Sequence, residues 1–128
     1  MRIESFDLLD SKDKFHRKAL HWSGQFDEIS FFNSNGSPDQ WGRFESVLAV
    51  KALHSFCADE DVLDQLQQFL LKHTCGFIPG FLSYDLKNEI EELRTSTMDK
   101  LGFPAAYFFV PTITVRWAAN QVHIQADN

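Results

Sequence analysis

Apolar residues recur at helical spacing near the start of the chain. Between residues 11 and 22 the positions i, i+4 and i+7 are Phe15, Ala19 and Trp22, and charged residues fill the opposite face. This pattern predicts a short amphipathic helix. Ser11 is its expected N-cap, and Gly24 is its expected end.

A second helix is predicted after residue 58. Asp59, Glu60 and Asp61 place negative charge on its first turn, where the helix dipole favours it. Gly76 is the residue expected to end it. The apolar face of this helix comprises Val62, Leu66, Phe69, Leu70 and His73.

Two strands are predicted between these helices. Residues 29–32 read Ile-Ser-Phe-Phe, and residues 33–39 are turn formers that include Asn-Gly and Ser-Pro. Residues 43–56 are rich in Val, Ala, Leu and Phe, with Lys51 in the middle. We interpret this run as a buried strand, although its Ala and Leu content leaves a helix as the alternative.

The segment from Gly76 to Tyr84 is apolar and contains two glycines and a proline, which is typical of a strand that another backbone approaches closely. Asp85 is expected to cap a short helix over residues 86–93, with Tyr84 mostly buried. Residues 105–126 alternate in polarity and predict two or three strands, with Asn120 in a connection.

These elements lack regular strand-helix-strand alternation, so the fold class is α+β, an antiparallel sheet with helices packed on it. The last strand is followed at once by the end of the sequence and is expected to be a sheet edge. The chain is therefore expected to be a piece of a larger protein and to self-associate when isolated. The apolar face that carries this expectation comprises Ile113, Val115, Trp117, Val122 and Ile124.

Length and charge narrow the possible classes of protein and of binding partner. The 128 residues suit a single domain, 44% are hydrophobic, and the net charge of −6 argues against nucleic acid and anionic membrane surfaces as partners. The N-terminus lacks the pattern of a secretory signal, and no apolar run is long enough to span a membrane. Cys57 and Cys75 have no metal or disulfide spacing, so we expect reduced thiols, a core position for Cys57 and a cytoplasmic location.

Candidate chemistry in the sequence is sparse. The five histidines fall at no metal-ligand spacing, and no hydrolase, nucleotide or dinucleotide motif occurs, so no catalytic residue and no metal site are predicted. Glu89, Glu91 and Glu92 are best interpreted as a solvated helix face, against a paired-carboxylate site as the alternative.

Three blocks of sequence nevertheless resemble one family. Residues 31–34, Phe-Phe-Asn-Ser, are followed after a loop by residues 41–49, Trp-Gly-Arg-Phe-Glu-Ser-Val-Leu-Ala. Residues 80–86, Gly-Phe-Leu-Ser-Tyr-Asp-Leu, and residues 101–104, Leu-Gly-Phe-Pro, come next. Their order is similar to the N-terminal domain of aminodeoxychorismate (para-aminobenzoate) synthase component I and, more distantly, of anthranilate synthase component I.

The chain also departs from the family pattern. Asn33 stands where the anthranilate branch has Glu, which favours the aminodeoxychorismate branch. Ser83 replaces a usual Gly, and Val110-Pro111 replaces an aromatic-Asp pair. The alternatives that stay open are an anthranilate-type enzyme and a free-standing binding module of the same fold.

The resemblance implies a non-catalytic scaffold or regulatory domain, residues 1–128, of an enzyme that acts on chorismate in folate biosynthesis. Chorismate and Mg²⁺ would belong to a C-terminal domain of the parent chain, with no cofactor in this segment, and a glutamine amidotransferase subunit would be a further partner. By resemblance, tryptophan would be bound by Ser34, Trp41, Gly42 and Phe44, whereas Arg43, Gly80, Tyr84 and Asp85 would be structural. From the residues alone, Ser34 is expected to cap the Asn-Gly turn and Trp41 to cover the loop, with binding of a flat amphipathic ligand as the alternative.

Overall fold

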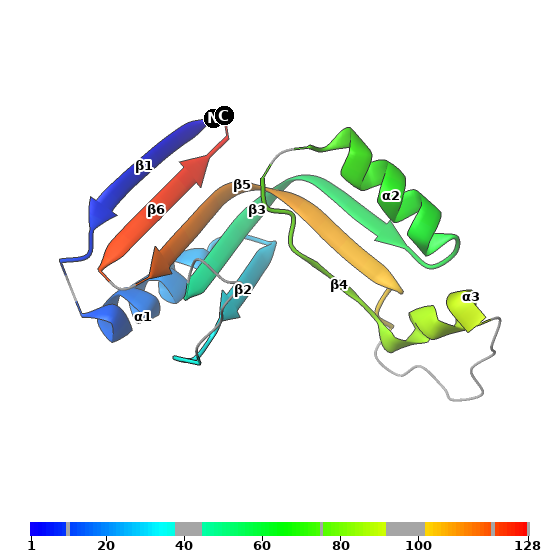
Figure 1. Ribbon diagram of the computed structural model, residues 1–128, viewed down its shortest axis with the longest axis horizontal. Coiled ribbons are helices and arrows are strands. Elements are labelled where there is room, and N and C mark those ends of the chain that lie inside the picture. The colour runs from blue at the N-terminus through cyan, green and yellow to red at the C-terminus, as the bar shows by residue number, and fades with distance from the viewer. Residues whose placement is uncertain (10, 38–44, 75, 92–101, 119, 128) are drawn as a thin grey trace. The chain divides into compact units, whose positions relative to one another are not determined.

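The computed structural model describes residues 1–9, 11–37, 45–74, 76–91, 102–118 and 120–127. The fold is α+β, with a six-stranded antiparallel sheet in the order β1-β6-β5-β3-β2 and β4 also paired to β5 (Figure 1). The chain forms two compact units. Unit 1 comprises Met1–Ala52 and Pro111–Asn128, and unit 2 comprises Leu53–Val110.

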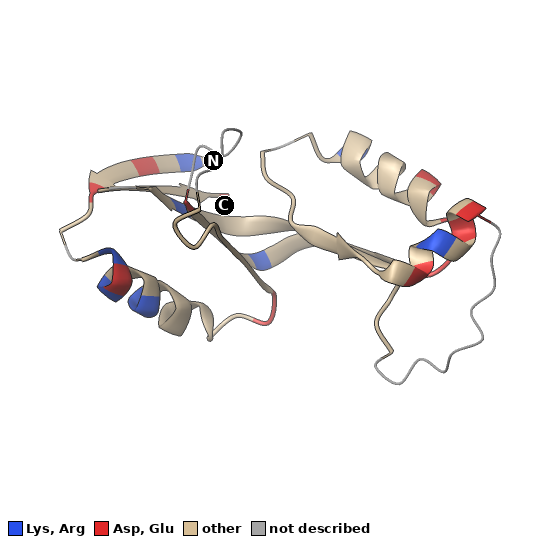
Figure 2. Cartoon of the chain, turned by 60° about the horizontal axis from the view of Figure 1, so that its bottom comes forward, with Lys and Arg blue, Asp and Glu red and all other residues tan. Residues whose placement is uncertain are grey.

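Strands β3 (Ser46–Ala58) and β5 (Ala106–Ala118) each run through both units. In unit 1, helix α1 (Lys12–Ser23) packs on one face of the sheet that the unit 1 parts of these strands form with β1 (Arg2–Asp7), β6 (Gln121–Ala126) and β2 (Ile29–Asn33) (Figures 1 and 2). The predicted helix and both caps are confirmed: the Ser11 side chain accepts a hydrogen bond from the Lys14 N–H, and Gly24 is the C-cap. The core of this unit comprises Ala19, Leu48, Val50, Val115, Trp117 and Val122.

Strand β1 was not predicted, and it changes the C-terminal edge. It pairs antiparallel with β6 from Arg2 opposite Ala126 to Asp7 opposite Gln121, so β6 has a neighbour on each side. The β1 sequence, Arg-Ile-Glu-Ser-Phe-Asp, lacks the apolar alternation that identifies a strand, and every residue of β1 is exposed. The prediction that the last strand is a sheet edge is therefore wrong.

The apolar face of the C-terminal strands is covered within the chain. Val115, Trp117 and Val122 are buried, and Ile113 and Ile124 pack against the same core. Phe15 and Leu20 of α1 lie over this core. Helix α1 thus covers most of this face, and self-association of the isolated chain stays a prediction.

Strand β2 and the turn after it follow the prediction. The Ser37 N–H donates to the Ser34 carbonyl oxygen at 3.0 Å, and Asn35 and Gly36 between them have φ of 52° and 74°. Two consecutive positive φ values are what a type I′ turn needs, and Asn-Gly is the pair that tolerates them best. Residues 46–58 form a strand, not a helix, and burial is continuous only over residues 48–50.

In unit 2, helix α2 (Val62–Lys72) packs on β3 and β5 through Val62, Ala58 and Ala106. Val62 and Leu66 of the predicted face are buried, but Leu70 is 41% exposed. The helix ends at Lys72 with His73 as C-cap, so Gly76 lies beyond its end and the predicted stop is three residues late. The prediction of a helix after Asp59 is otherwise confirmed.

Strand β4 (Gly80–Leu82) pairs with β5 and leads into the 3₁₀ helix η1 (Tyr84–Leu86) and the short helix α3 (Lys87–Glu91). A Cβ at Gly80 would lie 2.2 Å from Cδ1 of Phe108 and 2.4 Å from the Tyr107 carbonyl oxygen. The close approach predicted from the glycines is therefore confirmed, and it comes from a side chain as well as from backbone.

Two burial predictions in this unit are wrong. Tyr84 is 81% exposed, because η1 directs it to solvent, where Lys87 Nζ lies 4.8 Å from its ring centroid. Cys57 is exposed because side chains alternate along β3: Phe56 and Ala58 face the core under α2, so Cys57 faces away from it. No helix among the described residues is long and apolar enough to cross a membrane.

Candidate functional site

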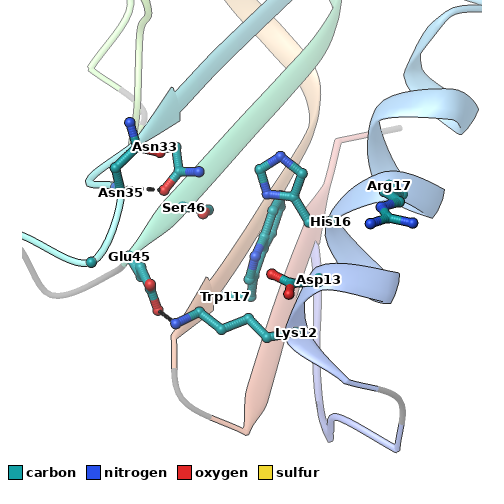
Figure 3. A pocket seen from close by; sticks show the side chains of 10 residues that line it. Lys12, Asp13, His16, Arg17, Asn33, Asn35, Glu45, Ser46 and Trp117 are labelled. Atoms are coloured by element: carbon teal, nitrogen blue, oxygen red, sulfur yellow. Dashed lines mark hydrogen bonds and ion pairs between the residues drawn. The ribbon is translucent and has the colours of Figure 1, made fainter.

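A cavity of about 410 Å³ lies in unit 1 between α1 and the adjoining ends of β2 and β3. Figure 3 shows its two walls facing each other with Trp117 between them. The helix contributes Lys12, Asp13, His16 and Arg17, the strands and turn contribute Asn33, Asn35, Gly36, Glu45 and Ser46, and β5 contributes Trp117.

Local structure places each wall. The Ser11 cap fixes the first turn of α1, which carries Lys12 and Asp13. The Asn33 side-chain oxygen accepts a hydrogen bond from the Asn35 N–H at 2.9 Å, which holds the turn at the end of β2. Lys12 and Glu45 form an ion pair that joins the helix to the strand wall.

Aromatic contacts fix the inner end of the cavity. The Trp117 ring stacks with Phe31 at 5.9 Å between centroids and meets Phe15 edge-on at 5.2 Å. His16 meets Phe31 edge-on at 5.0 Å and Trp117 at 6.1 Å. The indole and imidazole are thus held by packing, which is how protein sites orient polar groups on rigid elements.

Ser34, which the resemblance assigns to tryptophan, lies beside this cavity without lining it. Its neighbours Asn33 and Asn35 line the cavity, whereas its own N–H donates to the Glu45 carbonyl oxygen at 3.0 Å. Its carbonyl closes the Asn-Gly turn, which agrees with its expected structural role at this turn. Trp41, Gly42, Arg43 and Phe44 lie outside the described residues.

In unit 2 the second motif forms part of a smaller cavity of about 250 Å³. Ser83 and Asp85 line it together with Asp59 and Glu89, whereas Tyr84 points to solvent. Tyr84 and Asp85 lie at a strand-to-helix junction, as predicted. Asp85 lies inside η1, whose N-cap residue is Ser83, so the prediction that Asp85 is the N-cap is wrong.

Two carboxylates of this cavity, Asp59 and Glu89, accept backbone hydrogen bonds. Asp59 Oδ1 accepts from the Ala105 N–H at 3.1 Å. Glu89 accepts from the N–H groups of Val62 and Leu63 at 2.9 and 3.2 Å. Glu89 and Glu91 are exposed, as a solvated helix face requires, and the Glu89 carboxylate in addition caps α2; Glu92 lies outside the described residues.

The histidines do not form a metal centre in the part of the chain that the structure describes. No group of three or more His, Cys, Asp or Glu side chains there could hold a metal ion. His54 of β3 and His73 stack at 4.6 Å between ring centroids. Desolvation, followed by the charges of His54 and Lys72, lowers the pKa of His73 below its usual value.

Comparison of the sequence with models of protein families and with curated proteins finds no match. The described residues form a polar cavity with an aromatic end in unit 1, and a strand-to-helix junction with hydrogen-bonded carboxylates in unit 2. Sequence reasoning missed the unit 1 cavity, because its residues come from four separate elements.

Proposed function

We propose that this chain is the N-terminal, non-catalytic domain of an aminodeoxychorismate synthase component I-like enzyme that acts on chorismate in folate biosynthesis. The observation that carries the proposal is the segment Gly80–Leu86. It forms a strand paired to β5 and then a helix, with the side chain of Phe108 against Gly80. The resemblance expects a strand-to-helix turn at these residues, and this turn supports the proposal.

The α+β architecture supports the same proposal, since an antiparallel sheet with helices on it is what the resemblance implies. The parent enzyme would bind chorismate and Mg²⁺ in its C-terminal domain and would take nitrogen from ammonia or from a glutamine amidotransferase subunit. The role of this chain would be to complete the core of that enzyme in the cytoplasm and to hold a tryptophan near Ser34.

Catalysis is not expected from the chain itself. Two of the carboxylates that line the unit 2 cavity, Asp59 and Glu89, accept hydrogen bonds from backbone N–H groups. Purified chain mixed with chorismate, ammonium and Mg²⁺ should form neither aminodeoxychorismate nor anthranilate. Turnover above that of heat-denatured chain would refute the non-catalytic assignment.

Growth after deletion of the coding region for residues 1–128 tests the pathway. Our proposal predicts a strain that needs para-aminobenzoate and is not relieved by tryptophan. Relief by tryptophan alone would instead favour an anthranilate-type enzyme. Growth without either supplement would refute both assignments.

A free-standing binding module is the second candidate, and a specific observation favours it. Helix α1 covers the apolar face of the C-terminal strands, and β1 covers the edge of β6, so unit 1 needs no second domain at these two places. A deletion strain that grows without either supplement, together with a folded isolated chain that binds a small ligand, would support the module.

A further inference from the structure

We propose that the unit 1 cavity is a binding site for a small organic carboxylate, with the indole N–H of Trp117 donating a hydrogen bond to it. The inference goes beyond the proposed function and does not depend on it. It concerns the walls built by α1, β2 and β3, and it leaves out Ser34, which does not line the cavity.

The first observation is a buried donor without an acceptor. Trp117 is 1% exposed, and its Nε1 has no hydrogen-bond partner among the described residues, although buried polar atoms nearly always have one. Because the residue also lines the cavity, and the indole lies between its two walls (Figure 3), the missing partner can come from a molecule in that space.

The chemistry of the donor restricts the ligand. An indole nitrogen only donates, so the group opposite it must be an acceptor, such as a carboxylate oxygen. An ammonium group would leave the N–H unsatisfied. The volume of about 410 Å³ falls within the range of small-molecule pockets.

The side-chain charges that line the cavity balance, because Lys12 and Arg17 face the two acids Asp13 and Glu45. The first turn of α1 adds the positive end of its dipole, which favours a negative ligand. Of the two acids present, Glu45 is paired with Lys12. Asp13 is the acid that opposes an anion, and Arg17 on the next turn of the helix offsets it.

Polar groups on the strand wall complete the site. Asn33 and Asn35 lie at the end of β2, and the 2%-exposed Ser46 begins β3. These side chains can hydrogen-bond a further polar group of the ligand, while Trp117 and His16 supply ring surface at the inner end.

The test follows the indole N–H signals of the full chain by NMR, with each signal assigned from a single Trp→Phe variant. The probes are benzoate, benzamide and benzylamine, which share a ring and differ in charge. We expect benzoate to shift the Trp117 signal saturably and the Trp22 signal not at all, since Trp22 does not line the cavity. Benzamide should bind at least about fivefold more weakly, and benzylamine should produce no shift.

Variants separate the donor from general charge effects. Trp117→Phe keeps a ring and removes the N–H, and it should weaken benzoate binding about tenfold. The affinity is measured from the rise in melting temperature that benzoate produces. Arg17→Gln should weaken binding about fivefold, and Asp13→Asn should tighten it by about twofold or more. Lys18→Gln removes the same charge as Arg17→Gln from the next residue of α1, which does not line the cavity, and should have no comparable effect.

Several results would overturn the proposal. A Trp117 signal that stays fixed at saturating benzoate would mean that water alone meets this N–H. Equal or tighter binding of benzylamine would make the site cationic. Equal losses in Arg17→Gln and Lys18→Gln, or unchanged affinity in a folded Trp117→Phe variant, would show that binding does not use this cavity.

Discussion

Removal of the Glu89 carboxylate should destabilise helix α2 from its first turn. The carboxylate accepts from the N–H groups of Val62 and Leu63 across 2.9 and 3.2 Å. Asp61, the residue at the N-cap position, has φ of 48° and its side chain makes no capping hydrogen bond. Glu89 therefore performs the capping that the local sequence does not.

The size of the effect follows from these contacts. Loss of an N-cap usually costs about 1 kcal/mol, and a charged acceptor contributes more than a neutral one. Because Glu89 is an exposed residue, solvent reduces the second contribution. We expect Glu89→Ala to lower the free energy of unfolding by about 1–2 kcal/mol, and Glu89→Gln, which keeps one acceptor oxygen, by about half of that.

Urea unfolding followed by circular dichroism measures this loss, and amide hydrogen exchange locates it. The amides of Val62 and Leu63 should exchange faster in Glu89→Ala, whereas β6 should be unaffected. Glu91→Ala is the matched control, because Glu91 is an exposed acid on the same short helix. A Glu89→Ala variant within about 0.3 kcal/mol of the parent, or a Glu91→Ala variant with an equal loss, would refute the capping argument.

Two further perturbations test unit 2. Gly80→Ala should lower the free energy of unfolding by about 2 kcal/mol or more, because its Cβ would overlap Phe108 and the Tyr107 carbonyl; a normal urea midpoint would show that the strands relax at no cost. Because the pKa of His73 is lowered in the folded chain, the unfolded chain binds more protons, and stability should fall as the pH drops below about 6.5. His73→Gln should reduce the change in melting temperature between pH 7.5 and 5.5. His21→Gln, on α1, should leave that change in place.

Much of the local structure was determined by the sequence itself. The spacing of Phe15 and Ala19 with the Ser11 cap predicted α1, because capping and amphipathicity act over a few residues. The Asn35-Gly36 turn followed from the φ values that these two residues tolerate. The close approach at Gly80 was indicated by a glycine inside a strand pattern.

Interactions between distant segments were decided only by the tertiary structure. Strand β1 has no apolar face to reveal it, and it exists because β6 offers its backbone groups from the other end of the chain. Glu89 caps a helix that begins 27 residues earlier. The burial of Trp117 could be predicted from strand alternation, but its N–H without a partner and the cavity beside it require α1, β2 and β3 to meet, and no local pattern encodes that meeting.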